Sequence, residues 1–89
     1  MNAIITVVGS DKVGIISEVS SLLAQHKANI VDITQTILSG NFVMMMVVNL
    51  DEAELSVDEL RSFLKSSEEK LNVEINVMAE KVFSSMNRI

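Results

Sequence analysis

Hydrophobic and polar residues divide the chain into strand-like and helix-like segments, beginning with an apolar run near the N-terminus. Residues 3–8 are apolar except for Thr6, which predicts a buried strand over about residues 2–9. Apolar residues then recur at every third or fourth position and predict an amphipathic helix over about residues 12–26. The helix is expected to end between His26 and Asn29, because asparagine readily adopts a left-handed cap conformation.

The middle of the chain predicts a β-hairpin. Residues 30–39 are rich in β-branched side chains and predict a strand, Ser39-Gly40-Asn41 is a turn signal, and residues 42–50 predict the returning strand. The returning strand is apolar on both faces, and Met44-Met45-Met46 must divide between them because side chains alternate along a strand. One layer of helices covers only one face. The other face is therefore expected to be covered by a partner surface or by the C-terminal segment.

The last third of the chain predicts a helix, a strand and a short terminal helix. Ser56 and Glu59 have the spacing of a capping box and begin a predicted helix over about residues 57–70. Strict alternation predicts a half-exposed strand over about residues 73–78. Apolar residues at helical intervals then predict a helix over about residues 79–87; they are Met78, Val82, Met86 and Ile89.

The order of these elements predicts an α+β fold. Strand, helix, strand, strand, helix, strand gives a ferredoxin-like βαββαβ sandwich, with a four-stranded antiparallel sheet and two helices on one face. A short C-terminal helix is added to this arrangement. At 89 residues, the chain is expected to form one domain over residues 1–89.

Composition restricts the classes of function. There is no cysteine and only one histidine, which argues against disulfides and thiolate metal sites, and we expect no metal and no cofactor. The net charge of −5, from 7 basic and 12 acidic residues, argues against binding to nucleic acid or to an anionic membrane surface. The apolar runs are shorter than the ~20 residues of a membrane-spanning helix, and no signal peptide is visible. We expect a cytoplasmic protein.

The segment from Gly9 to Ile16 is the candidate for chemistry. A strand, a glycine-bounded loop and a helix start bring free backbone N–H groups and the positive end of a helix dipole together. Such a place attracts anionic groups, including the carboxylate of an amino acid. No Ser–His–Asp set, paired carboxylates or cysteine nucleophile can be argued from the sequence, and we therefore expect no catalytic residues and no enzyme activity.

These residues also carry a resemblance to a known family. Gly9-x-Asp11-Lys12-x-Gly14-Ile15-Ile16 after the first strand, Asn29-Ile30 after the first helix and Asp32-Ile33-x-Gln35-Thr36 resemble ACT domains, small regulatory modules that bind amino acids and related ligands. More closely, the chain resembles stand-alone bacterial ACT proteins of uncharacterised role. Those are similar to the N-terminal ACT domains of formyltetrahydrofolate deformylase and of the glycine cleavage repressor.

The resemblance implies a ligand site between the first loop and the exit of the first helix, at a homodimer interface. It implies a non-catalytic, allosteric sensor of an amino acid or similar metabolite. The alternative is a protein-interaction module that regulates a separate enzyme or transcription factor without a ligand of its own. The residues that the resemblance assigns to the ligand site are Gly9, Asp11, Lys12, Gly14, Ile15, Asn29 and Ile30.

Other roles for these residues stay open at this stage. Asp11 has the chemistry to accept an amino-acid ammonium or to cap the first helix, and Asn29 to bind a ligand or to end that helix. Many relatives have glycine two positions before the asparagine, where this chain has Lys27. A left-handed backbone there would cost a lysine on the order of 1 kcal/mol and rearrange the helix exit.

Overall fold

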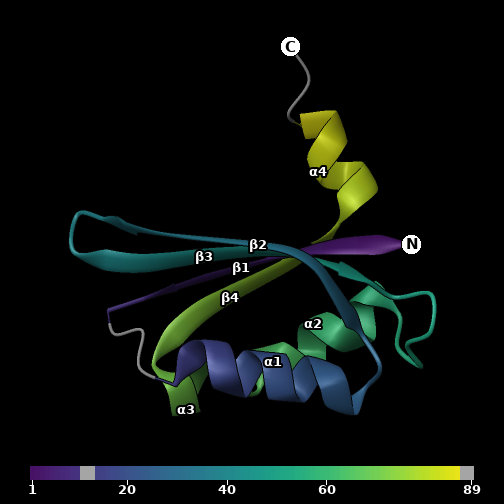
Figure 1. The fold of residues 1–89 in the computed structure, drawn as a ribbon, viewed down its shortest axis with the longest axis horizontal. Helices are drawn as coiled ribbons and strands as arrows, with labels where there is room; N and C mark the ends of the chain where they lie inside the picture. Colours follow the sequence, from purple (N-terminus) through teal and green to yellow (C-terminus); the bar gives the residue numbers. More distant parts are fainter. Residues whose placement is uncertain (11–13, 87–89) are drawn as a thin grey trace.

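Four strands form one antiparallel sheet in the order β2-β3-β1-β4 (Figure 1). The computed structural model describes residues 1–10 and 14–86. The elements along the chain are β1 (Asn2–Gly9), α1 (Ile15–Gln25), β2 (Asn29–Leu38), β3 (Asn41–Asn49), α2 (Val57–Lys65), α3 (Glu68–Leu71), β4 (Val73–Ala79) and α4 (Glu80–Met86). The predicted ferredoxin-like βαββαβ fold with an additional C-terminal helix is confirmed.

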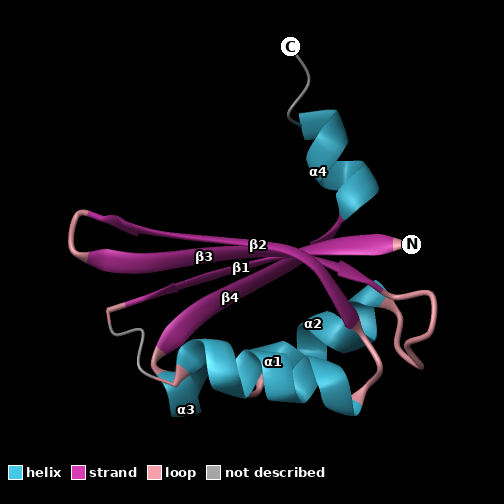
Figure 2. Cartoon of the chain, in the orientation of Figure 1, coloured by secondary structure: helices cyan, strands magenta, loops and turns pink. Residues whose placement is uncertain are grey.

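One face of the sheet carries the hydrophobic core. Helices α1, α2 and α3 all lie on this face, as Figure 2 shows. Met44 and Met46 of β3 point toward them and are fully buried. The buried apolar residues of this core are Ala3, Ile5, Val7, Ile15, Val19, Leu23, Ala28, Phe42, Met44, Met46, Val48, Leu50, Leu60, Leu64, Ile75 and Val77.

The opposite face of the sheet is only partly covered. Helix α4 rises on this side and contacts β1 and β4. Met45 lies on this face with its neighbours Val43 and Val47, and all three are only half-buried. The prediction that the methionines divide between the two faces is confirmed, whereas a partner surface over Met45 stays a prediction.

The β2–β3 hairpin closes with a two-residue turn. Ser39 and Gly40 have φ values of 51° and 79°, and Leu38 pairs with Asn41. Two successive residues with positive φ are typical of the type I′ turn, whose twist matches that of the strands. The turn therefore fixes the hairpin register, and β3 begins at Asn41, one residue earlier than predicted.

Two helix boundaries differ from the prediction. Helix α1 begins at Ile15 rather than at residue 12, because Gly14 has φ 77° and a left-handed residue cannot continue a right-handed helix. The predicted helix over 57–70 is interrupted after Lys65. There the Ser66 hydroxyl donates to the Phe63 carbonyl oxygen at 2.6 Å, in competition with regular helical hydrogen bonding.

The exit of α1, with His26 as the C-cap residue, lies within the predicted range from His26 to Asn29. The left-handed residue is Lys27, with φ 60°, and Asn29 already belongs to β2. The Ala28 amide donates to the Leu23 carbonyl at 3.0 Å and the Lys27 amide to the Ala24 carbonyl at 3.1 Å. This is the Schellman arrangement, in which Ala28 packs on Leu23 in the core. The cap geometry thus places the left-handed residue at Lys27, the position at which the sequence anticipated strain, and not at Asn29.

Candidate functional site

The first half of the predicted site begins at Gly9, the last residue of β1. Gly9 is buried, and a Cβ there would lie 2.7 Å from Cγ1 of Val73 and 3.5 Å from Cδ1 of Ile15. Real Cβ atoms do not approach carbon so closely. Glycine is therefore required here because β4 and the start of α1 pack against its backbone.

Gly14 is the N-cap of α1 and has a different reason to be glycine. Its φ of 77° is strained for any residue with a side chain, and a Cβ would meet nothing within 4 Å. Its carbonyl accepts the first helical hydrogen bond, from the Glu18 amide at 2.9 Å. The backbone amides before Glu18, in the first turn of the helix, have no carbonyl partner within the helix. Among residues 1–10 and 14–86, nothing thus fills the space that a side chain of residue 14 would occupy beside the positive end of α1.

The other predicted residues at this end divide into two groups. Ile15 is 1% exposed and belongs to the core, so its side chain is not available to a ligand. Asp11 and Lys12 lie outside the described residues. The N-cap residue of α1 is Gly14, which has no side chain to cap the helix.

The second half of the predicted site lies at the start of β2. Asn29 is exposed and pairs with Asn49 of β3, while Ile30 is half-buried against the core and pairs with Val48. Asn29 therefore has a side chain accessible to a ligand, and Ile30 is anchored in the fold. The register shifts between Ile30 and Asp32, which makes a bulge just after this pair.

The two halves lie at opposite ends of α1 (Figure 1). Eleven residues separate them along the helix. At 1.5 Å per residue, α1 is roughly 16 Å long, and Gly14 and Asn29 lie beyond its two ends. One amino-acid ligand does not span that distance. Within one chain, the structure does not bring the predicted site residues together.

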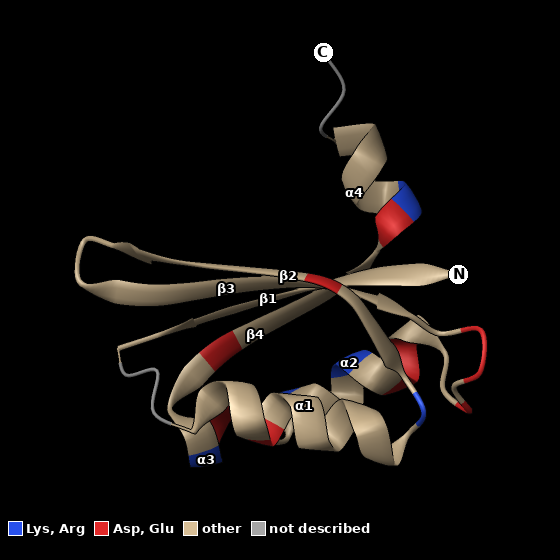
Figure 3. Cartoon of the chain, in the orientation of Figure 1, with Lys and Arg blue, Asp and Glu red and all other residues tan. Residues whose placement is uncertain are grey.

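The edge strand β2 lies next to α1 and exposes apolar side chains. Val31 is 55% exposed, Ile33 38%, Ile37 59% and Leu38 60%. Asp32 is the single charged residue of β2, and β3 has none, so the hairpin is almost uncharged (Figure 3). An exposed, apolar edge strand of this length is a template for pairing with another chain.

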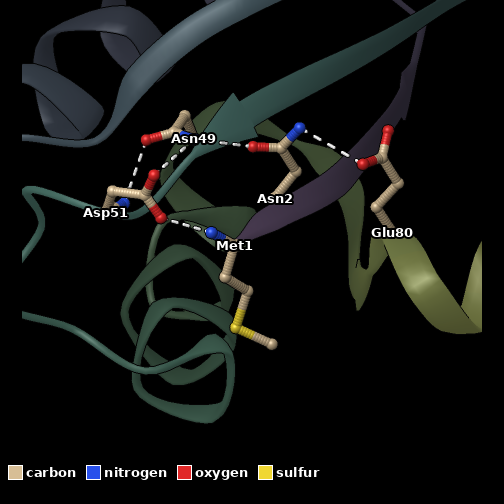
Figure 4. Close-up of polar contacts among 5 residues, drawn as sticks. All are labelled: Met1, Asn2, Asn49, Asp51 and Glu80. Carbon is tan, nitrogen blue, oxygen red and sulfur yellow. Dashed lines mark hydrogen bonds and ion pairs between the residues drawn. The ribbon is translucent and has the colours of Figure 1, made fainter.

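A polar network, which the sequence pattern did not reveal, surrounds Asn49 (Figure 4), the residue that pairs with Asn29. The Asn49 amide nitrogen donates to Oδ1 of Asn2 at 2.9 Å, and the Asn2 amide nitrogen donates to Oε1 of Glu80 at 3.2 Å. Asn49 also bonds Asp51, whose carboxylate pairs with the ammonium group of Met1. The network ties the N-terminus to the start of α4 across three chain segments.

The ammonium group of Met1 lowers the pKa of Asp51, with a further contribution from the hydrogen bond with Asn49. This carboxylate thus stays ionised at lower pH than an isolated aspartate. His26 packs edge-on against Phe63, with ring centroids 4.2 Å apart, in a structural role. Over residues 1–10 and 14–86, no three His, Asp or Glu side chains are grouped to hold a metal ion. Nor is any helix in these ranges long and apolar enough to cross a membrane.

Comparison with known proteins gives the family. A family model described as "ACT domain" matches residues 2–78. The chain belongs to the ACT domain family. Members are typically regulatory ligand-binding domains. A UPF0237 protein of Clostridium acetobutylicum is 48% identical to this ACT domain over 89 residues, which is 100% of both chains.

Solved structures agree with this assignment. An ACT domain protein from Streptococcus pneumoniae superposes with a TM-score of 0.84 and 43% identity, over 93% of each chain. A formyltetrahydrofolate deformylase from Pseudomonas syringae has a TM-score of 0.78 and 23% identity over 86% of this chain and 26% of its own. The second likeness shows a shared fold alone. The resemblance inferred from the glycine loop and from Asn29-Ile30 is therefore confirmed for the family, and the ligand-site residues stay a prediction.

Proposed function

We propose that this ACT domain is a non-catalytic regulatory domain that binds an amino acid or similar small metabolite between two copies of the chain. The separation of Gly14 and Asn29 by the length of α1 carries the proposal. A site that needs both ends of this helix requires a second copy of the helix, running in the opposite direction.

The exposed edge of β2 supports such an arrangement. If two β2 strands pair antiparallel about a two-fold axis, their α1 helices also run antiparallel. The Gly14 end of one copy then lies beside the Asn29 end of the other. The backbone amides in the first turn of α1 suit a ligand carboxylate, and the side-chain carbonyl oxygen of Asn29 suits an ammonium group. The two-fold axis produces two equal sites.

Such a site couples binding to assembly. A ligand held between two copies favours the arrangement in which both halves of the site meet. It can shift the equilibrium between arrangements only by the difference between its binding free energies to them, typically about 1–3 kcal/mol. The regulated enzyme or transcription factor would lie on another chain or segment. The sensing mechanism needs no reaction at the site.

The test is a thermal-shift screen of the purified protein against the twenty amino acids and folate-pathway metabolites, with light scattering on the same samples. We expect selective stabilisation of a dimer by one ligand class. Gly14→Asn should abolish that shift, because asparagine tolerates a left-handed backbone and fills the open space. Gly40→Asn is the matched control. Gly40 also has a positive φ, of 79°, an added Cβ there would also meet nothing within 4 Å, and the residue lies in the hairpin turn. Equal losses in both variants, or no shift in wild type, would contradict the proposal.

A protein-interaction module without a ligand is the second candidate. Val82 and Met86 of α4 are 51% and 71% exposed, and Met45 is only half-buried on the same side of the sheet. These side chains would suit an apolar partner surface. A flat ligand panel on a stable protein, together with a specific partner recovered from cell extract and lost in a Met86→Asp variant, would favour this candidate.

A further inference from the structure

The two edge strands of the sheet, β2 and β4, differ in whether helix side chains bond their outward backbone groups. At β4, the backbone amide of Ile75 donates to Oε2 of Glu68 at 2.6 Å. The carbonyl oxygen of Val77 accepts from Nε and Nη2 of Arg61 at 3.0 and 2.9 Å. Both backbone groups face away from β1, because they bond side chains and not the neighbouring strand. Two of the groups through which another strand would pair, one donor and one acceptor, are therefore occupied.

The two side chains that occupy this edge are themselves held in place. Arg61 in α2 pairs with Asp58 at 2.6 Å, and its side chain is 40% exposed. Glu68 in α3 pairs with Lys65 at 3.2 Å, and its side chain is 26% exposed. The Ile75 amide lowers the pKa of Glu68, so the carboxylate remains an acceptor in mildly acidic solution. Short helices beneath the edge thus supply a fixed donor and a fixed acceptor.

The β2 edge lacks this arrangement. Hydrogen-bonded and non-bonded residue pairs alternate in antiparallel ladders. Because the backbone groups of Ile75 and Val77 point away from β1, the pairing of β4 with β1, of β1 with β3 and of β3 with β2 shows which residues of β2 have backbone groups that point away from the sheet. These are Ile33, Gln35 and Ile37. Of these, the Ile33 amide donates to the carboxylate of Asp32 at 2.9 Å. No helix side chain among the described residues bonds the outward groups of β2, in contrast to Arg61 and Glu68 at β4.

We propose that Arg61 and Glu68 close the β4 edge to a second copy of this chain, so that assembly proceeds through β2 alone and stops at the dimer. The dimer itself rests on the proposed function; the closure of β4 does not. A protein with both edges open would pair β2 with β2 and β4 with β4 in alternation, which gives open-ended chains of molecules. Closing one edge turns a polymerising sheet into a dimeric one.

The experiment compares oligomeric mass across a concentration series by size-exclusion chromatography with light scattering. The test variant is Arg61→Ala/Glu68→Ala. The control is Glu18→Ala/Lys70→Ala, which also removes one acidic and one basic side chain and so leaves the net charge unchanged. These two side chains form an ion pair 2.7 Å long that joins α1 to α3 and does not bond β4. We expect the test variant to exceed the wild-type mass by about twofold or more and to grow with concentration. The control should match wild type.

A second variant separates the two edges. Gln35→Pro removes an outward amide of β2 without removing a bond within the sheet, so it should block pairing at β2. Added to Arg61→Ala/Glu68→Ala, it should limit assembly to a dimer through β4. If wild type and Gln35→Pro are both monomers but the triple variant dimerises, the proposed β2 dimer is wrong and the closure of β4 stands.

The closure is overturned if Arg61→Ala/Glu68→Ala keeps native circular dichroism and the wild-type mass at every concentration. If the double variant does not fold, the single variants decide. Each opens one backbone group, and each should still exceed the wild-type mass. Arg61→Lys, which keeps a donor for Val77, should restore the wild-type mass. Folded single variants at wild-type mass would equally reject the proposal.

Discussion

Replacing Lys27 with glycine should stabilise the protein. Lys27 occupies the left-handed position of the cap that ends α1, with φ 60°. A side chain in this conformation crowds its own backbone, and glycine has no such crowding. Relatives with glycine at this position would avoid the strain, and the substitution should leave the cap hydrogen bonds of Ala24 and Leu23 unchanged.

The size of the effect follows from three contributions. Relief of the left-handed strain should stabilise the folded protein by about 1–2 kcal/mol. The greater conformational freedom of glycine in the unfolded chain opposes this and should destabilise the folded protein by about 0.5–1 kcal/mol. The ion pair between Lys27 and Glu54 is 3.7 Å long, with side chains 67% and 81% exposed, so its loss costs close to nothing. We expect a net gain of about 0.5–1 kcal/mol, which raises Tm by roughly 2–8 °C in a domain of this size.

Urea unfolding followed by circular dichroism measures this change, with Lys27→Ala as the control. Alanine also removes the ion pair but keeps the left-handed strain, so it should lie within about 0.5 kcal/mol of wild type. The reasoning about the helix exit would be refuted if Lys27→Gly were no more stable than Lys27→Ala.

Three further predictions concern stability. Gly9→Ala places a Cβ 2.7 Å from Val73 and should lower the free energy of unfolding in urea titrations by about 1–3 kcal/mol. Met44→Ala, at a fully buried position, should cost about 2–5 kcal/mol in the same assay, and Met45→Ala on the open face clearly less. The lowered pKa of Glu68 means that its stabilising contribution is present above the unfolded-state pKa and is lost as pH falls through the lower folded pKa. In thermal melts at a series of pH values, the Tm of Glu68→Gln should therefore fall less steeply toward acidic pH than the Tm of wild type.

The fold was predictable because local patterns agree with it. Ser56 and Glu59 form both hydrogen bonds of the predicted capping box, at 3.1 and 3.0 Å. The apolar run of β3 divides between two faces because side chains alternate along any strand. These features depend on residues close together in the chain, which a single sequence displays.

The differences arise where packing into the core decides the local backbone. Lys27 is left-handed because Ala28 must reach the core against Leu23, which outweighs the preference of asparagine for that conformation. Gly14 lies before the helix rather than in its first turn for a similar reason: Ile15 is drawn into the core. Hydrophobic spacing alone cannot reveal such choices.

The candidate site was predictable only in its parts. The sequence identified Gly14 and Asn29 and placed a helix between them, but the pairing surface that could bring two copies together becomes visible only in the fold, as the exposed apolar edge of β2. The carboxylate of Asp51 and the ammonium group of Met1 pair across fifty residues, and no short motif marks such a contact. The same is true of Arg61, whose guanidinium donates to the Val77 carbonyl oxygen from sixteen residues away.

The most direct test of a site shared between two copies is calorimetry on a mixture of two damaged chains. Gly14→Asn and Asn29→Ala are unfolded together, refolded and titrated with the amino acid that most stabilises wild type. Each variant alone should not bind. Half of the dimers in the mixture are mixed and carry one intact site, so the mixture should bind about a quarter of the wild-type amount. A mixture that binds no more than its components would contradict a site formed by two chains.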